Sequence, residues 1–399
     1  MGNKINKNVG ILRISIIGAG LMALAPLSTD MYLSSFTIIA EDMATMPSFV
    51  QLSLSIFLAG LSITQLIYGP IADRFGRKKP LLIGLLMFVV ATLVCITTSN
   101  ITVFIVARFF QALGAASGMV ISQVLGPDLY DNDKKKLGLF FTILSFVMGI
   151  APIVAPTIGG FILAAAGWRT IFIALLAFSI LMILTVIVLI PETKGANPAI
   201  KLSKSLSSYK AVVKKPGFIS VSFTRSLANA GMFFYITSAP IIFMQYYKLS
   251  SMTFGLVFGI NAVAILIGSA LNGILLKKFG PEKLFMISTI LISFFSILLI
   301  IVGFMPKNMM FFMVPLFGYL LSLGGILPGA ATLALHGHGE NSGSASSLLG
   351  CITFAFSFAA STFVSFIPNS IPVITKCIAA SGLIASIIFF SNRQKITQE

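Results

Sequence analysis

Long apolar runs, separated by short polar segments, follow one another along the whole chain. A helix that crosses a hydrocarbon layer of about 30 Å, at about 1.5 Å per residue, needs roughly 20 mostly apolar residues. Twelve runs meet this requirement, and the predicted spans are 11–39, 49–72, 80–98, 101–127, 137–165, 170–190, 217–245, 252–276, 283–304, 309–335, 344–366 and 372–390. The pattern therefore predicts an all-α membrane protein with twelve transmembrane helices.

The composition agrees with this assignment and removes several classes of site. Hydrophobic residues make up 57% of the chain and charged residues 10%, whereas soluble domains carry about 25% charged residues. The three cysteines lie inside predicted spans, and no Cys/His cluster has the spacing of a zinc site. We therefore expect no disulfide, no metal and no organic cofactor.

Two classes of membrane protein, ATP-driven pumps and membrane enzymes, fit the sequence poorly. The chain has no Gly-Lys dipeptide, so it lacks the phosphate-binding G-x-x-x-x-G-K-[ST] loop of ATP-driven pumps. It has two histidines and one carboxylate placed within a span, which is too few for the clustered acids and bases of a membrane enzyme. We expect a protein that is not an enzyme.

The net charge of +16 comes from 27 Lys and Arg residues that fall mostly in alternate loops. Examples are Lys78 and Lys79 after the second span, 134–136 after the fourth, and 277–278 after the eighth. By the positive-inside rule this places both termini in the cytoplasm. The expected location is a bacterial inner membrane. The expected partners of these cations are anionic lipid headgroups, not nucleic acid.

The chain divides into two similar halves. Residues 191–216 are rich in Lys and Ser and contain helix-interrupting Pro and Gly, which predicts a cytoplasmic linker. Gly273–Gly280 then repeats the Gly, Phe and Gly spacing of Gly69–Gly76. We predict six-helix bundles over 1–190 and 217–399, joined by 191–216, and a monomer.

The segment Gly69–Lys79, G-P-I-A-D-R-F-G-R-K-K, is a short basic turn between the second and third spans. It resembles the loop at this position in major facilitator superfamily transporters, which are built from two pseudo-symmetric six-helix bundles. The resemblance implies a charge network that gates the inner side of the protein. Its expected members are Gly69, Asp73, Arg74, Gly76, Arg77 and Asp128.

Two opposite charges lie at similar predicted depth in the first half. Asp30 is the one carboxylate that we place in the hydrocarbon region, and Arg108 lies about 12 Å into the fourth span. Ionisable groups in the membrane are costly and usually functional, so we predict that both take part in proton coupling. The pairing is expected to be direct or through Gln111 and water. The alternatives are that Asp30 caps a helix break and that Arg108 fixes a helix contact.

Both residues lie in recognisable strings. S-T-D-M-Y-L around Asp30 resembles the first helix of the Bcr/CflA drug-resistance branch, although Ser34 and Ser35 replace the usual proline and its small neighbour. R-F-F-Q-A at Arg108 resembles the R-x-x-Q-G motif of proton-coupled members, with Ala112 in place of the last Gly. The resemblance implies export of drug-like molecules in exchange for protons.

Small residues recur along the fifth span. Gly149, Pro152, Pro156 and Gly159 are spaced to share one helix face, which allows a neighbouring helix to approach closely. With Gly160, the string A-P-T-I-G-G resembles the antiporter motif of exporters. The alternative is an ordinary packing seam.

Sparse polar and aromatic residues are the expected lining of a substrate cavity. An aromatic lining would suit a lipophilic or planar compound. Arg225 either faces this cavity or snorkels to the inner interface. The predicted lining residues are Tyr32, Gln111, Arg225, Asn229, Phe233, Tyr235 and Asn261.

Together these features predict a secondary active transporter that exports small amphipathic molecules by alternating access, with protons as the coupling ion. Proton-coupled nutrient uptake, or export of an endogenous metabolite such as a siderophore, is the alternative within transporters. A receptor or scaffold that transports nothing is the alternative of another class.

Overall fold

The structure, a computed structural model, describes residues 10–130, 132–193, 195, 202–306, 308–336, 338 and 341–394. Twelve helices in these ranges are long and apolar enough to cross a membrane, which confirms the expected number. The first span joins α1 (Ile11–Asp30), the 3-10 turn η1 (Leu33–Ser35) and α2 (Phe36–Asp42). The remaining spans of the first half are α3 (Pro47–Phe75), α4 (Lys78–Thr97), α5 (Ile101–Tyr130), α6 (Lys134–Ala166) and α7 (Trp168–Leu189).

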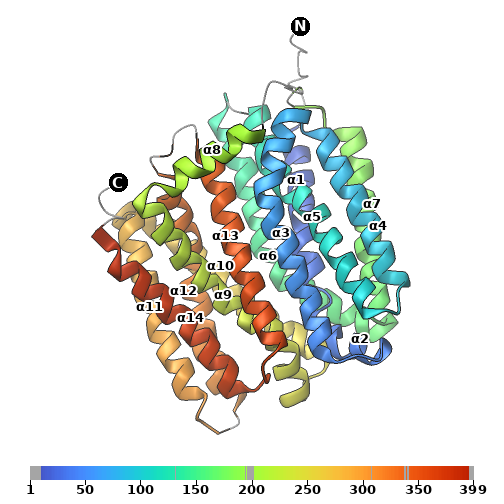
Figure 1. Cartoon of the computed structure of the whole chain (residues 1–399), viewed down its shortest axis with the longest axis vertical. Coiled ribbons are helices and arrows are strands. Elements are labelled where there is room, and N and C mark those ends of the chain that lie inside the picture. Colours follow the sequence, from blue (N-terminus) through green and yellow to red (C-terminus); the bar gives the residue numbers. More distant parts are fainter. Residues whose placement is uncertain are drawn as a thin grey trace.

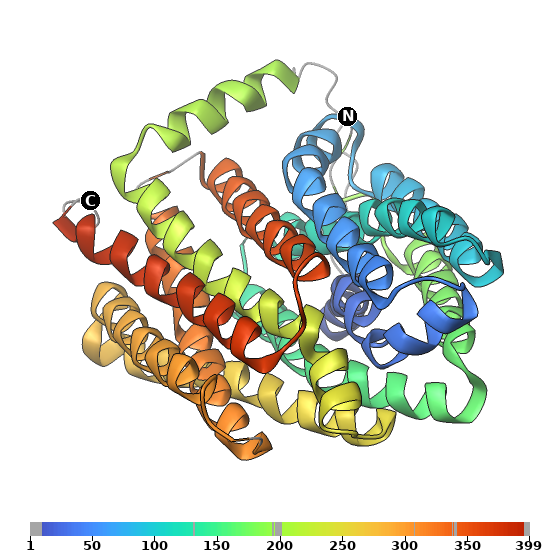
Figure 2. The ribbon, with the colours of Figure 1, turned by 60° about the horizontal axis from the view of Figure 1, so that its bottom comes forward.

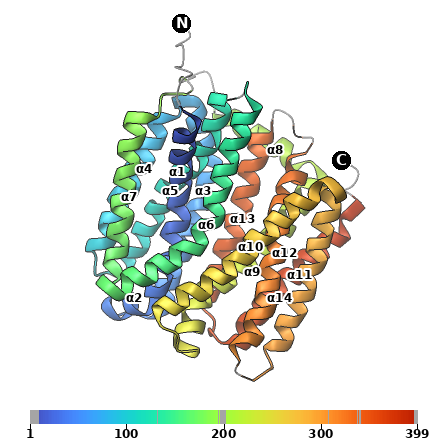
Figure 3. The ribbon, with the colours of Figure 1, turned by 180° about the vertical axis from the view of Figure 1, so that it is seen from behind.

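The second half begins with α9 (Pro216–Pro240), which continues into a π-helical segment, Ile241–Tyr246. It continues with α10 (Ser251–Phe279), α11 (Pro281–Val302), α12 (Met309–Leu335), α13 (Ser342–Ser365) and α14 (Ile371–Ser391). The two halves lie side by side, and they meet where α3 packs on α13 and α6 packs on α10 (Figures 1 and 3).

Helix α1 begins and α14 ends at the same end of the molecule, which we call the terminal face (Figure 1). The short helix α8 (Leu202–Val213) lies across this face and contacts α3, α9 and α13 (Figure 2). Its Tyr209 hydroxyl donates to the carbonyl of Leu66 at 3.0 Å. Much of the predicted linker is therefore a helix, which the apolar pattern missed because α8 is too polar and short. Residues 194 and 196–201 of the predicted linker lie outside the described ranges.

The first span breaks directly after Asp30, although no proline follows it. Pro26 inside α1 lacks the N–H that would bond to the carbonyl four residues earlier. The Ser28 hydroxyl donates to the Leu24 carbonyl at 2.6 Å, and the Thr29 hydroxyl to the Pro26 carbonyl at 3.0 Å. Side-chain bonds of this kind compete with the helical ladder and bend it. The break thus comes from residues before Asp30.

Helices α3 and α5 approach closely at Ala112, the residue that replaces the last Gly of the R-x-x-Q-G motif. A Cβ placed on Gly60 of α3 would lie 2.7 Å from the Cβ of Ala112 in α5. Contacts this short do not occur between real Cβ atoms, so one of the two positions must be glycine. Here the glycine is on α3, and Ala112 is accommodated.

Candidate functional site

A cavity of about 310 Å³ lies between the two halves. Helices α1, α3, α5 and α6 line it from the first half, and α9, α10, α12 and α13 from the second. Most of its wall is apolar, with contributions from Met119, Met148 and Met232. Among the lining residues only Asp30 and Arg225 carry a formal charge. The cavity therefore presents one carboxylate and one guanidinium to its contents.

Asp30 lies at the last position of α1, where its side chain is 6% exposed and faces the cavity. Its Oδ1 lies 2.9 Å from the Thr29 hydroxyl, whose single proton also has the Pro26 carbonyl within reach at 3.0 Å. No ion pair to it occurs in the part of the chain that the structure describes. The C-terminal end of a helix carries partial negative charge, so the position adds to the cost that burial places on the ionised carboxylate. Asp30 is suited to bind a proton or a cation.

Arg108 does not line this cavity and does not pair directly with Asp30. It is fully buried in α5, where Nη2 donates to the Ser28 carbonyl at 2.9 Å and Nη1 donates to Gln111 Oε1. The guanidinium also lies over the rings of Tyr32, at 4.4 Å, and Phe57, at 4.3 Å.

Of the two expected forms of the pairing, the direct one is absent and the one through Gln111 and water stays a prediction. The direct form failed because depth along a helix does not specify direction around it. Ser28 and Asp30 are two residues apart, so they point about 200° apart around α1. Arg108 contacts the α1 backbone at Ser28, whereas the Asp30 side chain faces the cavity. The contact matches the alternative considered for Arg108, which is that it fixes the packing of one helix on another.

Four of the seven residues predicted to line a substrate cavity do line this one. Arg225, Asn229, Phe233 and Tyr235 are all on α9, which forms much of the wall from the second half. Arg225 therefore faces the cavity and does not snorkel to the interface. Its buried Nε has no hydrogen-bond partner among the described residues.

Tyr32, Gln111 and Asn261 lie behind the wall. The Tyr32 hydroxyl is 3.1 Å from that of Ser53, and Gln111 Nε2 donates to the Thr92 hydroxyl at 2.8 Å. Asn261 Nδ2 donates to the Tyr235 hydroxyl at 3.0 Å. Each of the three has a polar partner behind the wall, although Asn261 Oδ1 has none among the described residues. The sequence alone could not distinguish such buried bonding from a role in the cavity.

The glycines and prolines of α6 contact both halves of the protein. A Cβ on Gly159 would collide with the Met31 carbonyl, just after Asp30, whereas one on Gly160 would lie 2.6 Å from the Ser251 carbonyl of α10. Gly149 faces Leu266 of α10, and the Pro156 carbonyl would lie 2.7 Å from a Cβ on Gly255. Pro152 lines the cavity. The seam thus connects the α1 break with the boundary between the halves.

The predicted charge network forms at the terminal face. Arg77 Nη1 lies 3.0 Å from Asp73 Oδ1, and Arg77 Nε lies 2.9 Å from Asp128 Oδ2. The expected contact between Arg77 and Asp128 is therefore present. Gly76 ends α3 with a φ of +87°, a backbone conformation that favours glycine.

Two other predicted members of this network lie at its edge. Arg74 stacks over the neighbouring Phe75 ring at 5.4 Å and forms no ion pair within the described ranges. Gly69 faces α13, where a Cβ would lie 3.9 Å from the Ser347 hydroxyl.

Sequence reasoning missed Glu192 and Thr193. Glu192 Oε1 accepts from the Arg77 backbone N–H at 2.7 Å, and its Oε2 accepts from that of Lys78 at 3.2 Å, so it caps α4. The Thr193 hydroxyl donates to Asp128 Oδ2 at 2.9 Å. The sequence did contain a signal for this contact, because Glu192 directly follows the sixth span on the side of the membrane where the basic turn lies.

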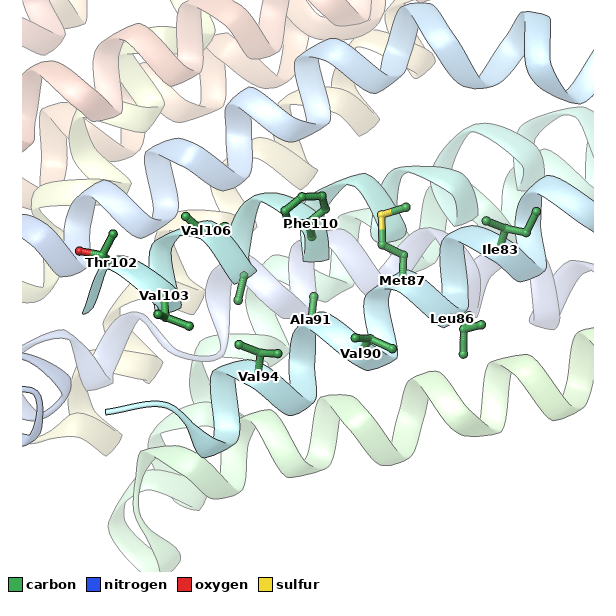
Figure 4. Close-up of a pocket in the computed structure, with 11 residues that line it drawn as sticks. Ile83, Leu86, Met87, Val90, Ala91, Val94, Thr102, Val103, Val106 and Phe110 are labelled. Carbon is green, nitrogen blue, oxygen red and sulfur yellow. The ribbon is translucent and has the colours of Figure 1, made fainter. Parts of the chain in front are cut away.

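A second concavity, between α4 and α5, has a different character (Figure 4). Its volume is about 610 Å³, and apolar side chains line it apart from Thr102. Several of them, among them Ile83, Leu86 and Val106, are half exposed. Such a surface fits contact with lipid acyl chains and holds no charge for coupling.

Residues 18–391 match the family model of the Major Facilitator Superfamily. YdgK of Bacillus subtilis strain 168, named an uncharacterized MFS-type transporter, is 32% identical over 387 residues, which cover 95% of each chain. The bicyclomycin resistance protein homolog of Haemophilus influenzae is 30% identical over 86% of each chain. Multidrug resistance protein D of Escherichia coli strain K12 is 29% identical over 69% of this chain and 68% of its own.

The fold is also similar to that of solved structures. The xylose transporter XylE from E. coli, in a partially occluded inward-open conformation, superposes with a TM-score of 0.71 at 14% identity, over 96% of this chain and 97% of its own. At this level of identity the similarity concerns the fold alone.

Proposed function

Since the chain belongs to the major facilitator superfamily, we propose that it is a multidrug exporter of the bacterial inner membrane that exchanges drug-like amphipathic molecules for protons. Relatives named bicyclomycin resistance protein homolog and multidrug resistance protein D support the export of drugs. The cavity between the halves supports a small-molecule substrate, because its volume and mostly apolar wall suit such a ligand.

One observation carries the coupling mechanism: Asp30 faces this cavity without a cationic partner among the described residues. A buried carboxylate with no cation beside it is costly when ionised, so it binds a proton or a cationic group. Because one carboxylate can hold only one of them, substrate and proton exclude each other. This exclusion is what exchange requires.

Alternating access is supported by the contacts that join the halves opposite the terminal face. Gln51 Nε2 in α3 donates to the Thr237 carbonyl at 3.0 Å and to Asn369 Oδ1 at 3.2 Å. Gln245 Nε2 donates to the Thr37 hydroxyl at 3.2 Å. These are a few neutral hydrogen bonds, which can break when that side opens.

The terminal face is assigned to the cytoplasm. The basic residues Lys78, Lys134 and Lys277 begin or end helices at this face. The positive-inside rule favours the cytoplasmic side for such a cluster. This assignment places both termini in the cytoplasm.

Reconstitution in proteoliposomes tests the proposal. We expect an imposed pH gradient to drive movement of a lipophilic cationic dye, its dissipation to stop that movement, and Asp30→Asn to abolish it. Glu41→Gln is the matched control, because Glu41 is an exposed acid at the opposite face. Gradient-driven movement by Asp30→Asn at the rate of the unaltered protein would contradict the mechanism.

A further inference from the structure

The two charges of the central cavity lie on walls that belong to different halves. Asp30 is contributed by α1 and Arg225 by α9. Within the described part of the chain neither forms an ion pair, either with the other or with a third residue. The remaining lining residues are uncharged. The cavity is therefore polarised, with a negative wall and a positive wall.

The N–H groups of the Arg225 guanidinium have no hydrogen-bond acceptor among the described residues. A guanidinium carries five N–H donors, and one in a largely apolar cavity is costly unless an anion or water satisfies it. The buried Nε of Arg225 lacks a hydrogen-bond partner among the described residues, and no bond to its terminal nitrogens occurs there. Arg108 also has a buried Nε without a partner, and it differs in its terminal nitrogens, which donate to Ser28 and Gln111. Arg225 is the guanidinium left available for a ligand.

Polar groups next to Arg225 extend this binding surface. Asn229 is one helical turn further along α9, and its Nδ2 donates to the Ser357 hydroxyl at 2.9 Å. That bond fixes the amide beside the cavity. Thr353 of α13 also lines the cavity, but its hydroxyl donates to the Leu349 carbonyl at 2.7 Å and accepts from the Ser226 hydroxyl at 3.3 Å. Asn229, with one amide N–H not used by Ser357, is therefore the second donor that an anionic group at Arg225 would meet.

Between the charges the wall is apolar and partly aromatic. Met148 and Pro152 come from α6, and Met232 and Phe233 from α9. Tyr235 stacks on Phe258 with ring centroids 5.5 Å apart. Flexible methionines and fixed rings together suit a flat apolar body.

We propose that the transported compound is a zwitterion, with an apolar aromatic body between an anionic group that binds Arg225 and an ammonium that binds Asp30. This inference rests on the proposed function and names its substrate class. The ammonium competes with the proton for Asp30, so exchange still operates. The anion occupies a site where no proton is exchanged, so it contributes affinity and orientation.

Equilibrium binding to the full chain in lipid nanodiscs tests the proposal. The probes are four forms of one molecule: aminomethyl-biphenyl-carboxylic acid, its carboxamide, its N-acetyl derivative and the N-acetyl carboxamide. These forms remove the anion, the cation or both without changing the body. The proteins compared are the unaltered chain, Arg225→Gln, Arg225→Lys and Asp30→Asn. Lys277→Gln is the control, because it removes an exposed cation at the terminal end of α10.

We expect the zwitterion to bind best. Arg225→Gln should weaken both carboxylate forms by about tenfold or more and change the two carboxamides by less than about twofold, since a charged hydrogen bond is worth that ratio. Arg225→Lys should retain part of the preference, and Lys277→Gln all of it. Asp30→Asn should weaken the two ammonium forms only.

Three results would overturn the proposal. In the first, the unaltered protein binds the acid and the carboxamide equally, or binds none of the four forms. In the second, Arg225→Gln weakens binding of all four forms alike, which indicates a packing role. In the third, Arg225→Gln weakens binding of none of them. Because the assay applies no gradient, these results leave proton exchange untouched, whereas a failure of exchange in proteoliposomes leaves the binding pattern intact.

Discussion

At the scale of single residues, two arginines in predicted spans have opposite environments. Arg108 is fully buried, with its planar group bonded and enclosed by the rings of Tyr32 and Phe57. Arg225 faces the cavity and has no bonded partner within the described ranges. The first therefore stabilises the packing of α5 on α1, and the second is free to act on cargo.

This difference predicts different costs of substitution. Arg108→Lys keeps the charge but loses the fork of donors, leaving Gln111 or the Ser28 carbonyl without a partner, so we expect a loss of about 2 kcal/mol or more in stability. Arg225→Gln breaks no bond in the described structure and removes a costly buried charge, so the melting temperature should stay unchanged or rise. Thermal unfolding of both variants in the same detergent is the measurement. Equal melting temperatures for the two variants would show that the Arg108 contacts contribute little.

At the scale of elements, α6 is the helix on which the break after Asp30 packs. Gly159 lets the Met31 carbonyl approach α6, and Gly160 lets the Ser251 carbonyl of α10 approach it. The position of the Asp30 carboxylate therefore depends on how closely α6 fits against its neighbours. Small residues are the usual means of such close approach in membrane proteins.

Two alanine substitutions in this one helix separate close packing from helix propensity. Gly159→Ala should cost about 1–3 kcal/mol and abolish transport, because its Cβ collides with backbone that cannot move aside without shifting α1. Gly138→Ala, near the start of α6, meets nothing within 4 Å and should be neutral or slightly stabilising. Unfolding and transport assays on both variants are the measurements. Normal transport by Gly159→Ala would remove the proposed link between α6 and Asp30.

At the scale of the whole molecule, function depends on how the two halves meet at each side. Hydrogen bonds from Gln51 to the Thr237 carbonyl and to Asn369 tie α3 to the second half away from the terminal face. The Arg77 network lies at the terminal face and joins residues of the first half. The Gln51 bonds therefore join the two halves, whereas the ion pairs of Arg77 hold helices of the first half to one another.

Gln51→Leu should favour opening of the side opposite the terminal face. Loss of about 1 kcal/mol of net hydrogen bonding corresponds to a roughly fivefold change in the population of that state. Spin labels at Glu41 and Asn308 report the separation of the halves there by double electron–electron resonance. Gln123→Leu is the control, because Gln123 is an exposed glutamine of α5 with no hydrogen bond to the second half in the described structure. An unchanged distance distribution for Gln51→Leu would show that its bonds do not limit opening.

The sequence predicted those features that depend on position along the chain. Span number follows from apolar length. The Arg77–Asp128 contact was implied by the resemblance to major facilitator transporters, together with the position of Asp128 at a helix end on the same side. Direction around a helix axis was not accessible, so Arg108 was paired with Asp30 although it contacts Ser28. Glu192 was missed because it follows the last span of the first half, where a linker was expected.

The close approach of Gly60 and Ala112 has a consequence for how relatives are recognised. The space that a motif glycine provides lies between two helices, so a glycine on either helix can provide it, although a Cβ at position 60 would also lie 3.0 Å from the Phe109 carbonyl. A pattern that insists on glycine after R-x-x-Q would reject this chain. A criterion that adds side-chain volumes across the α3–α5 pair would accept it.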